Sequence, residues 1–87
     1  MDQTETVTMH AKVYAPFKIY FDGQAHSVSA SNKVGPFDIL PRHHNFITLL
    51  EPGNLTVRAP GKPDMVMPIQ KGVMHVKQNE VKVFLDI

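Results

Sequence analysis

The sequence predicts an all-β protein, a flattened antiparallel β-sandwich of about eight to ten short strands. Two observations indicate this fold. Short β-prone runs alternate with turn signals at intervals of about 7 to 12 residues. No window of a dozen residues places apolar side chains at the i, i+3, i+4, i+7 spacing of an amphipathic helix, and seven prolines and five glycines interrupt the 87 residues. A chain of this length forms one core, so we expect a single domain over residues 1–87.

The two ends of the chain carry the clearest strand patterns. Residues 6–13 alternate between polar and apolar side chains, with Val7, Met9, Ala11 and Val13 on one face. Residues 80–87 alternate in the same way, except that Phe84 lies among the polar positions. Strict alternation is typical of a strand with one buried face, so we predict a half-buried strand at each end.

Between these ends, six shorter runs are strand-like: KIYF, HSVSA, FITLL, LTVRA, MVMPI and VMHVK. Their turn signals are Asp22-Gly23, Ser31-Asn32, Pro52-Gly53, Pro60-Gly61 and Gln78-Asn79. Glycine and asparagine tolerate the positive φ that tight turns require, and proline pre-sets φ at the first central position. Pro68 cannot donate a ladder hydrogen bond, so we expect its strand at a sheet edge or a bulge.

Composition excludes several classes of partner. Nine basic residues oppose eight acidic ones, for a net charge of +1, and the basic residues are scattered along the chain. Nucleic acid and anionic membrane surfaces both attract a concentrated positive footprint, which is absent here. The longest apolar stretch, FITLL, is far too short to cross a bilayer, and zero cysteines exclude disulfides and thiolate ligands.

Five histidines raise the question of a metal site, and His43 and His44 are adjacent. No pair has His-x-His or His-x-x-x-His spacing, and adjacent residues in extended chain point to opposite sides. Catalysis by Asp38 with either histidine would need a nearby nucleophile, but the chain contains no Gly-x-Ser-x-Gly motif and no phosphate-binding glycine loop. We therefore expect no catalytic residue, metal or cofactor, and the protein is predicted not to be an enzyme.

Aromatic and sulfur-containing side chains are abundant for a small core. We expect most of these side chains to be buried, and those exposed beside Arg42 to suit a protein interface. The residues concerned are Tyr14, Phe17, Tyr20, Phe37, Phe46, Met65, Met67 and Met74.

Residues 34–53, VGPFDILPRHHNFITLLEPG, resemble a signature segment of the epsilon subunit of F-type ATP synthases. That family reads approximately Gly-Glu-Leu-Gly-Ile-Leu-Pro-Gly-His-Ala-Pro-Leu-Leu-Thr, followed shortly by Pro-Gly. The matching residues are Gly35, Ile39, Leu40, Pro41, His43, Thr48, Pro52 and Gly53. YFDG upstream resembles the family's Phe-Ser-Gly at Phe21 and Gly23. The last seventeen residues match its final segment at Gly72, Val76, Val81, Val83 and Asp86.

The resemblance implies the N-terminal β-sandwich domain of that subunit, a non-catalytic part of the rotor that links the gamma subunit to the membrane c-ring. Carried over by position, the c-ring side consists of Lys33, Val34, Gly35 and Pro36. The gamma side consists of Ala15, Arg42, His43 and Thr48. The implied location is cytoplasmic, at the inner face of the cell membrane and reaching it only through the c-ring. The family's C-terminal helical hairpin is not expected in residues 1–87.

Three family glycines are replaced here, by Asp38, Arg42 and Lys71. These changes, with His44, support an alternative: a stand-alone protein-binding module outside the ATP synthase, possibly a homo-oligomer. A third hypothesis is a metal or small-molecule site around His43 and His44.

Overall fold

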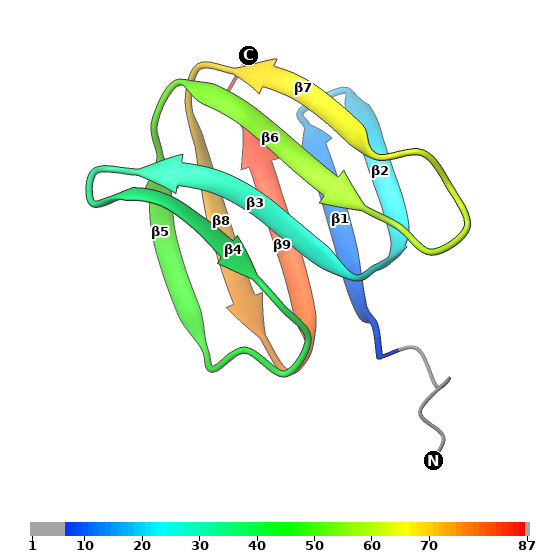
Figure 1. The fold of residues 1–87 in the computed structure, drawn as a ribbon. Helices are drawn as coiled ribbons and strands as arrows, with labels where there is room; N and C mark the ends of the chain where they lie inside the picture. The colour runs from blue at the N-terminus through cyan, green and yellow to red at the C-terminus, as the bar shows by residue number, and fades with distance from the viewer. Residues whose placement is uncertain (1–6, 87) are drawn as a thin grey trace.

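The computed structural model describes residues 7–86, which fold as a two-layered β-sandwich (Figure 1). The nine strands of this part are β1 (Met9–Ala15), β2 (Lys18–Ala25), β3 (Ser27–Asn32), β4 (Gly35–Ile39), β5 (Phe46–Leu50), β6 (Gly53–Arg58), β7 (Met65–Ile69), β8 (Gly72–Lys77) and β9 (Glu80–Leu85). The predicted fold class and strand number are confirmed.

One layer has five strands in the order β2-β1-β9-β8-β5, and the other has four in the order β4-β3-β6-β7. The strands pair antiparallel as predicted except at one place, where β1 and β9 pair in parallel, with Ala11 opposite Val81 and Val13 opposite Val83. Parallel neighbours need a long crossover between them. Here the crossover is the rest of the domain, since the first and last strands lie side by side.

The core lies between the two sheets and is built from alternate residues of each strand. Its fully buried larger side chains are Met9, Val13, Val28, Ile39, Leu55, Val57, Met74, Val76, Val81, Val83 and Leu85. Several of the predicted core aromatics and methionines, such as Phe37 and Met65, pack against this cluster at its margin. Phe17 is fully exposed. Removing this apolar surface from water is the main force that holds the sheets together.

Two predicted turns are wrong. Asp22 and Gly23 lie inside β2, opposite Lys12 and Ala11, and the chain reverses earlier, at Pro16 and Phe17. Proline fixes the φ angle that the reversal needs, while Asp22 is used in a contact with β1 that local sequence does not reveal. The Ser31-Asn32 turn is also displaced, because both residues belong to β3.

Other local predictions are confirmed. Gln78 and Asn79 join β8 to β9 with φ of 52° and 62°, as a two-residue hairpin with a primed turn requires. Pro68 lies on β7, an edge strand. The first predicted strand begins at Met9 and ends at Ala15, two residues beyond its expected end. Thr6 and Ile87 of the predicted end strands lie outside the described residues.

Candidate protein-binding site

The β3–β4 hairpin presents a preorganised loop. The Oδ1 atom of Asn32 accepts hydrogen bonds from the backbone N–H of Val34 (2.9 Å) and of Gly35 (3.3 Å). Gly35 has φ of 137°, which favours glycine, and Pro36 follows it. Val34 is 96% exposed at the tip. The loop therefore holds an apolar side chain in water on a constrained backbone, which reduces the entropy lost on docking.

Thr48 on β5 is attached to this same loop. Its Oγ1 accepts a hydrogen bond from Nδ2 of Asn32 at 3.1 Å, and the backbone N–H of Glu51 donates to the carbonyl of Ser31 at 2.9 Å. These bonds join the end of β3 to the edge of the five-stranded sheet. The resemblance assigns Thr48 and residues 33–36 to different partner surfaces, whereas the structure makes Thr48 a neighbour of Lys33 and Val34.

Arg42 and His43 lie in the loop between β4 and β5. Arg42 has a left-handed backbone, with φ of 67°, and its N–H donates to Oδ1 of Asn79 at 2.8 Å. The His43 ring stacks on His44, with centroids 4.2 Å apart, and meets Phe46 edge-on at 5.5 Å. The loop is therefore held by the β8–β9 hairpin on one side and by aromatic packing on the other.

A continuous apolar band crosses the outer face of the five-stranded sheet. The register places Ile19, Tyr14, Phe84, Val73 and Leu49 opposite one another, one from each strand in sheet order. Ile19 and Leu49 are 57% and 69% exposed. Contiguous exposed apolar surface of this kind marks a contact site. In the sequence, a local sign of this apolar band was Phe84, a large apolar residue among the polar positions of its strand.

On the same outer face, four residues before Tyr14, His10 joins three strands. Its Nε2 lies 2.7 Å from Oδ1 of Asp22 on β2, and its Nδ1 lies 3.1 Å from Oε2 of Glu80 on β9. Hydrogen bonds to Asp22 and then to Glu80 raise the pKa of His10 above its ordinary value of 6.5. His10 is therefore an outward-facing residue that two carboxylates from neighbouring strands hold in place.

Comparison with known proteins identifies the family. The family described as "ATP synthase, Delta/Epsilon chain, beta-sandwich domain" matches residues 8–87. The chain belongs to this family. Similar proteins include the ATP synthase epsilon chains of Laribacter hongkongensis, 28% identical over 92% of this chain, and of Gloeothece citriformis, 30% identical over 92%. The chain spans 58% and 57% of the lengths of these two relatives.

Two solved structures share the fold of this delta/epsilon sandwich. One is the Tetrahymena thermophila mitochondrial ATP synthase central stalk/c-ring, with a TM-score of 0.83 and 17% identity over 97% of this chain and 67% of that one. The other is the Euglena gracilis mitochondrial ATP synthase OSCP/F1/c-ring, also with a TM-score of 0.83 and 17% identity, over 98% and 54% of the two chains.

The residues that the resemblance assigns to gamma do not form one cluster in this sandwich. Ala15 follows Tyr14, which is opposite Phe84 near the end of β9, whereas Arg42 bonds to Asn79, just before β9 begins. The two residues therefore lie at opposite ends of one strand. The apolar band nevertheless runs from beside Ala15 on β1 to beside Thr48 on β5.

Asp38, His43 and His44 line the same open hollow of about 310 Å³ between β4 and the β4–β5 loop. Within it, Oδ1 of Asp38 accepts a hydrogen bond from Ser29 Oγ on the neighbouring strand, and Nδ1 of His43 lies 2.8 Å from the carbonyl oxygen of His44. Within residues 7–86, no group of three or more His, Cys, Asp or Glu side chains is arranged to hold a metal ion. A search of the same residues for a helix long and apolar enough to span a membrane finds none.

Proposed function

We propose that this domain is a rotor element of an F-type ATP synthase, which links the gamma subunit to the c-ring and takes part in ion-driven ATP synthesis by structural coupling. The observation that carries the proposal is the family match over residues 8–87. The named relatives are epsilon chains, and one structure of the same fold comes from a central stalk/c-ring assembly. The domain supplies no catalytic residue, so its contribution is mechanical.

The gamma subunit is assigned to the apolar band and the residues at its ends. The band spans the whole width of the five-stranded sheet, and its burial would supply most of the binding energy. Ala15 and Thr48 adjoin Tyr14 and Leu49, its members on β1 and β5, only through the backbone, because the Ala15 side chain packs against the core and Thr48 Oγ1 is bonded to Asn32. Arg42 and His43 add polar contacts at the corner nearest the β8–β9 hairpin.

The c-ring is assigned to the loop of Lys33, Val34, Gly35 and Pro36. The exposed Val34 side chain and the adjacent Lys33 offer one apolar and one cationic contact to polar loops of a membrane ring. The domain then reaches the membrane only through the c-ring, at the cytoplasmic inner face of the cell membrane.

The gamma assignment is tested by measuring the affinity of the purified chain for the gamma subunit of the same complex by calorimetry. Phe84→Ser removes the centre of the apolar band and should weaken binding by about tenfold or more, because central aromatic residues dominate interfaces. Val66→Ser is the matched control, since Val66 is a similarly exposed residue on β7 of the other sheet. Equal affinities for the two variants would contradict the assignment.

The c-ring assignment is tested by cross-linking in the assembled enzyme. The chain contains no cysteine, so Val34→Cys introduces a unique thiol. A thiol-reactive cross-linker at this position should capture the c subunit, while Lys62→Cys in the β6–β7 loop should not. If only Lys62→Cys were cross-linked to the c subunit, the c-ring would lie at the other end of the domain, and the assignment would be contradicted.

A further inference from the structure

Beside the apolar band, the outer face of the five-stranded sheet carries a row of basic side chains. Lys12 on β1 is directly opposite Lys82 on β9, and Lys82 is directly opposite His75 on β8. Neighbouring strands lie about 4.8 Å apart, so the row runs across three strands and ends at β2, where Asp22 is directly opposite Lys12. Like charges directly opposite one another destabilise a sheet, which makes this row a cost to the isolated domain.

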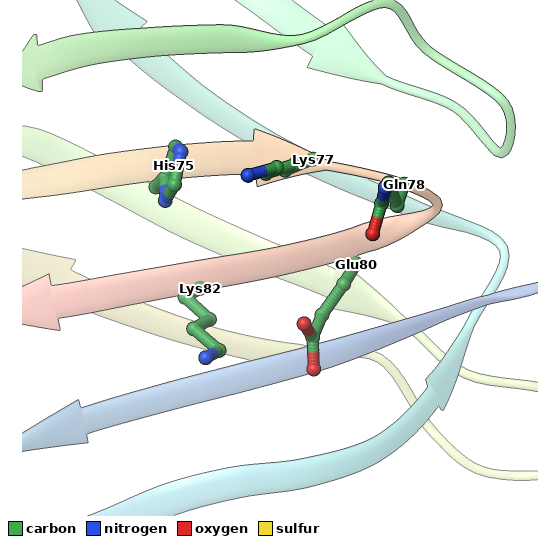
Figure 2. Close-up of a pocket in the computed structure, with 5 residues that line it drawn as sticks. All are labelled: His75, Lys77, Gln78, Glu80 and Lys82. Atoms are coloured by element: carbon green, nitrogen blue, oxygen red, sulfur yellow. The ribbon is translucent and has the colours of Figure 1, made fainter.

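The row continues into a cavity of about 170 Å³ on the β8–β9 hairpin (Figure 2). His75 and Lys77 line it from β8, and Glu80 and Lys82 line it from β9, with Gln78 at the turn. Figure 2 shows the Lys77 side chain extending back along β8 toward His75. The hollow is open to solvent, and two lysines and a histidine line it beside one acid, Glu80.

The carboxylates on this face are already engaged. Glu80 is held by Nδ1 of His10, and Asp22 by Nε2 of the same ring. Within residues 7–86, no carboxylate lies within 4.0 Å of the ammonium of Lys77 or Lys82. The raised pKa of His10 keeps these two acids neutralised to a higher pH than an ordinary histidine would. The ammonium groups of Lys77 and Lys82 are left to receive an outside acid, while that of Lys12 lies 4.9 Å from the centroid of the Tyr14 ring.

We propose that the row formed by Lys12, Lys82 and His75, together with Lys77 two residues further along β8, binds a carboxylate-bearing segment of the protein that covers the neighbouring apolar band. The inference rests on the proposed function, in which that protein is the gamma subunit. It assigns to the facing surface of gamma an apolar patch flanked by acidic residues.

A protein segment fits this row better than other anions do. The row is linear and continuous with apolar surface, which suits several side chains on one partner rather than a single tetrahedral ion. The net charge of +1 argues against nucleic acid. Charges beside an apolar patch orient an approaching partner and raise its association rate.

The proposal predicts that Lys82→Thr raises the melting temperature of the isolated domain and lowers its affinity for gamma. Lys82→Thr removes the middle cation and keeps a good strand former, so the isolated domain should melt at a higher temperature. The same variant should bind gamma roughly threefold more weakly at low salt and with a smaller loss of affinity when salt is added. A merely structural role for Lys82 would instead lower the melting temperature and the affinity together, and that result would overturn the proposal.

Lys62→Thr is the matched control, because Lys62 lies in the β6–β7 loop and should change neither binding nor its salt dependence. If the wild type and Lys82→Thr both bind gamma with equal affinity and equal salt dependence, this inference is overturned and the proposed function is left intact. Wild-type protein that fails to bind gamma would overturn both.

A titration followed by NMR separates a protein segment from a small anion. Hexaglutamate should shift the amide signals of His75, Lys77 and Lys82, and Lys82→Thr should abolish those shifts. Inorganic phosphate at the same charge concentration should have little effect. Equal shifts with phosphate would make this a small-anion site and contradict the assignment to a protein segment.

Discussion

At the scale of single residues, His10 is the most consequential polar side chain of the five-stranded sheet. A protonated imidazole donates from both ring nitrogens, and here both meet a carboxylate, from Asp22 and from Glu80. A neutral ring has one N–H, so one nitrogen would then present a lone pair to a carboxylate oxygen. The protonated form thus fastens β1 to both of its neighbours.

The stability of the domain should therefore depend on pH through His10. Because the folded-state pKa is raised above 6.5, the contribution is fully present below the unfolded value and is lost as pH rises through the folded value. Urea unfolding of the wild type and of His10→Gln, between about pH 5.5 and 8.5, should show the largest difference at the acidic end. A stability difference between the two proteins that grows toward alkaline pH would contradict this role of the protonated His10 ring.

Arg42 holds a backbone conformation that suits glycine, the residue that the family has at this position. Side chains in the left-handed region cost about 1 kcal/mol, so Arg42→Gly should stabilise the domain by up to about that amount. Lys71→Gly is the control. It also restores a family glycine, but Lys71 has no positive φ, so it should destabilise by about 0.5–1 kcal/mol. Chemical unfolding measures the change in the free energy of unfolding for both variants. Equal changes would refute the argument from backbone conformation.

At the scale of elements, Gly72 sets how closely β8 approaches its neighbours. A Cβ atom there would lie 2.9 Å from the carbonyl oxygen of Phe84 and 3.1 Å from the Leu85 side chain. Gly72→Ala should therefore destabilise the domain by about 1–3 kcal/mol, since the backbone of β9 would have to shift. Gly23→Ala is the control, because its nearest neighbour is 3.9 Å away. Similar unfolding midpoints for the two variants would contradict this packing.

Elements with strict alternation could be predicted from sequence, and those decided by distant contacts could not. The alternating faces of β1 and β9 and the positive-φ turn at Gln78 and Asn79 are local properties, and the structure has them. The prediction of a turn at Asp22-Gly23 is wrong because Asp22 lies within β2 and its carboxylate contacts His10, twelve residues earlier. The parallel pairing of β1 with β9 has no local signal.

The candidate site was predictable only where one segment makes it. The loop at residues 33–36 is one continuous segment, so the family resemblance could point to it, although the turn itself was expected at Ser31-Asn32. The apolar band and the basic row each take one residue from several strands, and their register is a property of the folded sheet. Phe84, out of phase in its strand, and Tyr14, one of the aromatic residues considered for an interface, were the local signals for this face.

At the scale of the whole molecule, the sandwich combines a contact loop at one corner with a binding face on one sheet. The apolar band faces outward from the five-stranded sheet, while the β3–β4 loop extends from the other sheet and is tied to β5 through Asn32. Two partners could thus be held at fixed relative positions by one rigid core. This is the property that a coupling element between gamma and the c-ring requires.

The central claim is that this domain works inside a rotary ATP synthase. The most direct test is to purify the tagged protein from the solubilised membranes of its own host and identify the accompanying proteins by mass spectrometry. The account predicts gamma, the c subunit and the catalytic subunits together, with Phe84→Ser reducing all of them. A folded protein recovered alone, or with unrelated partners, would contradict it.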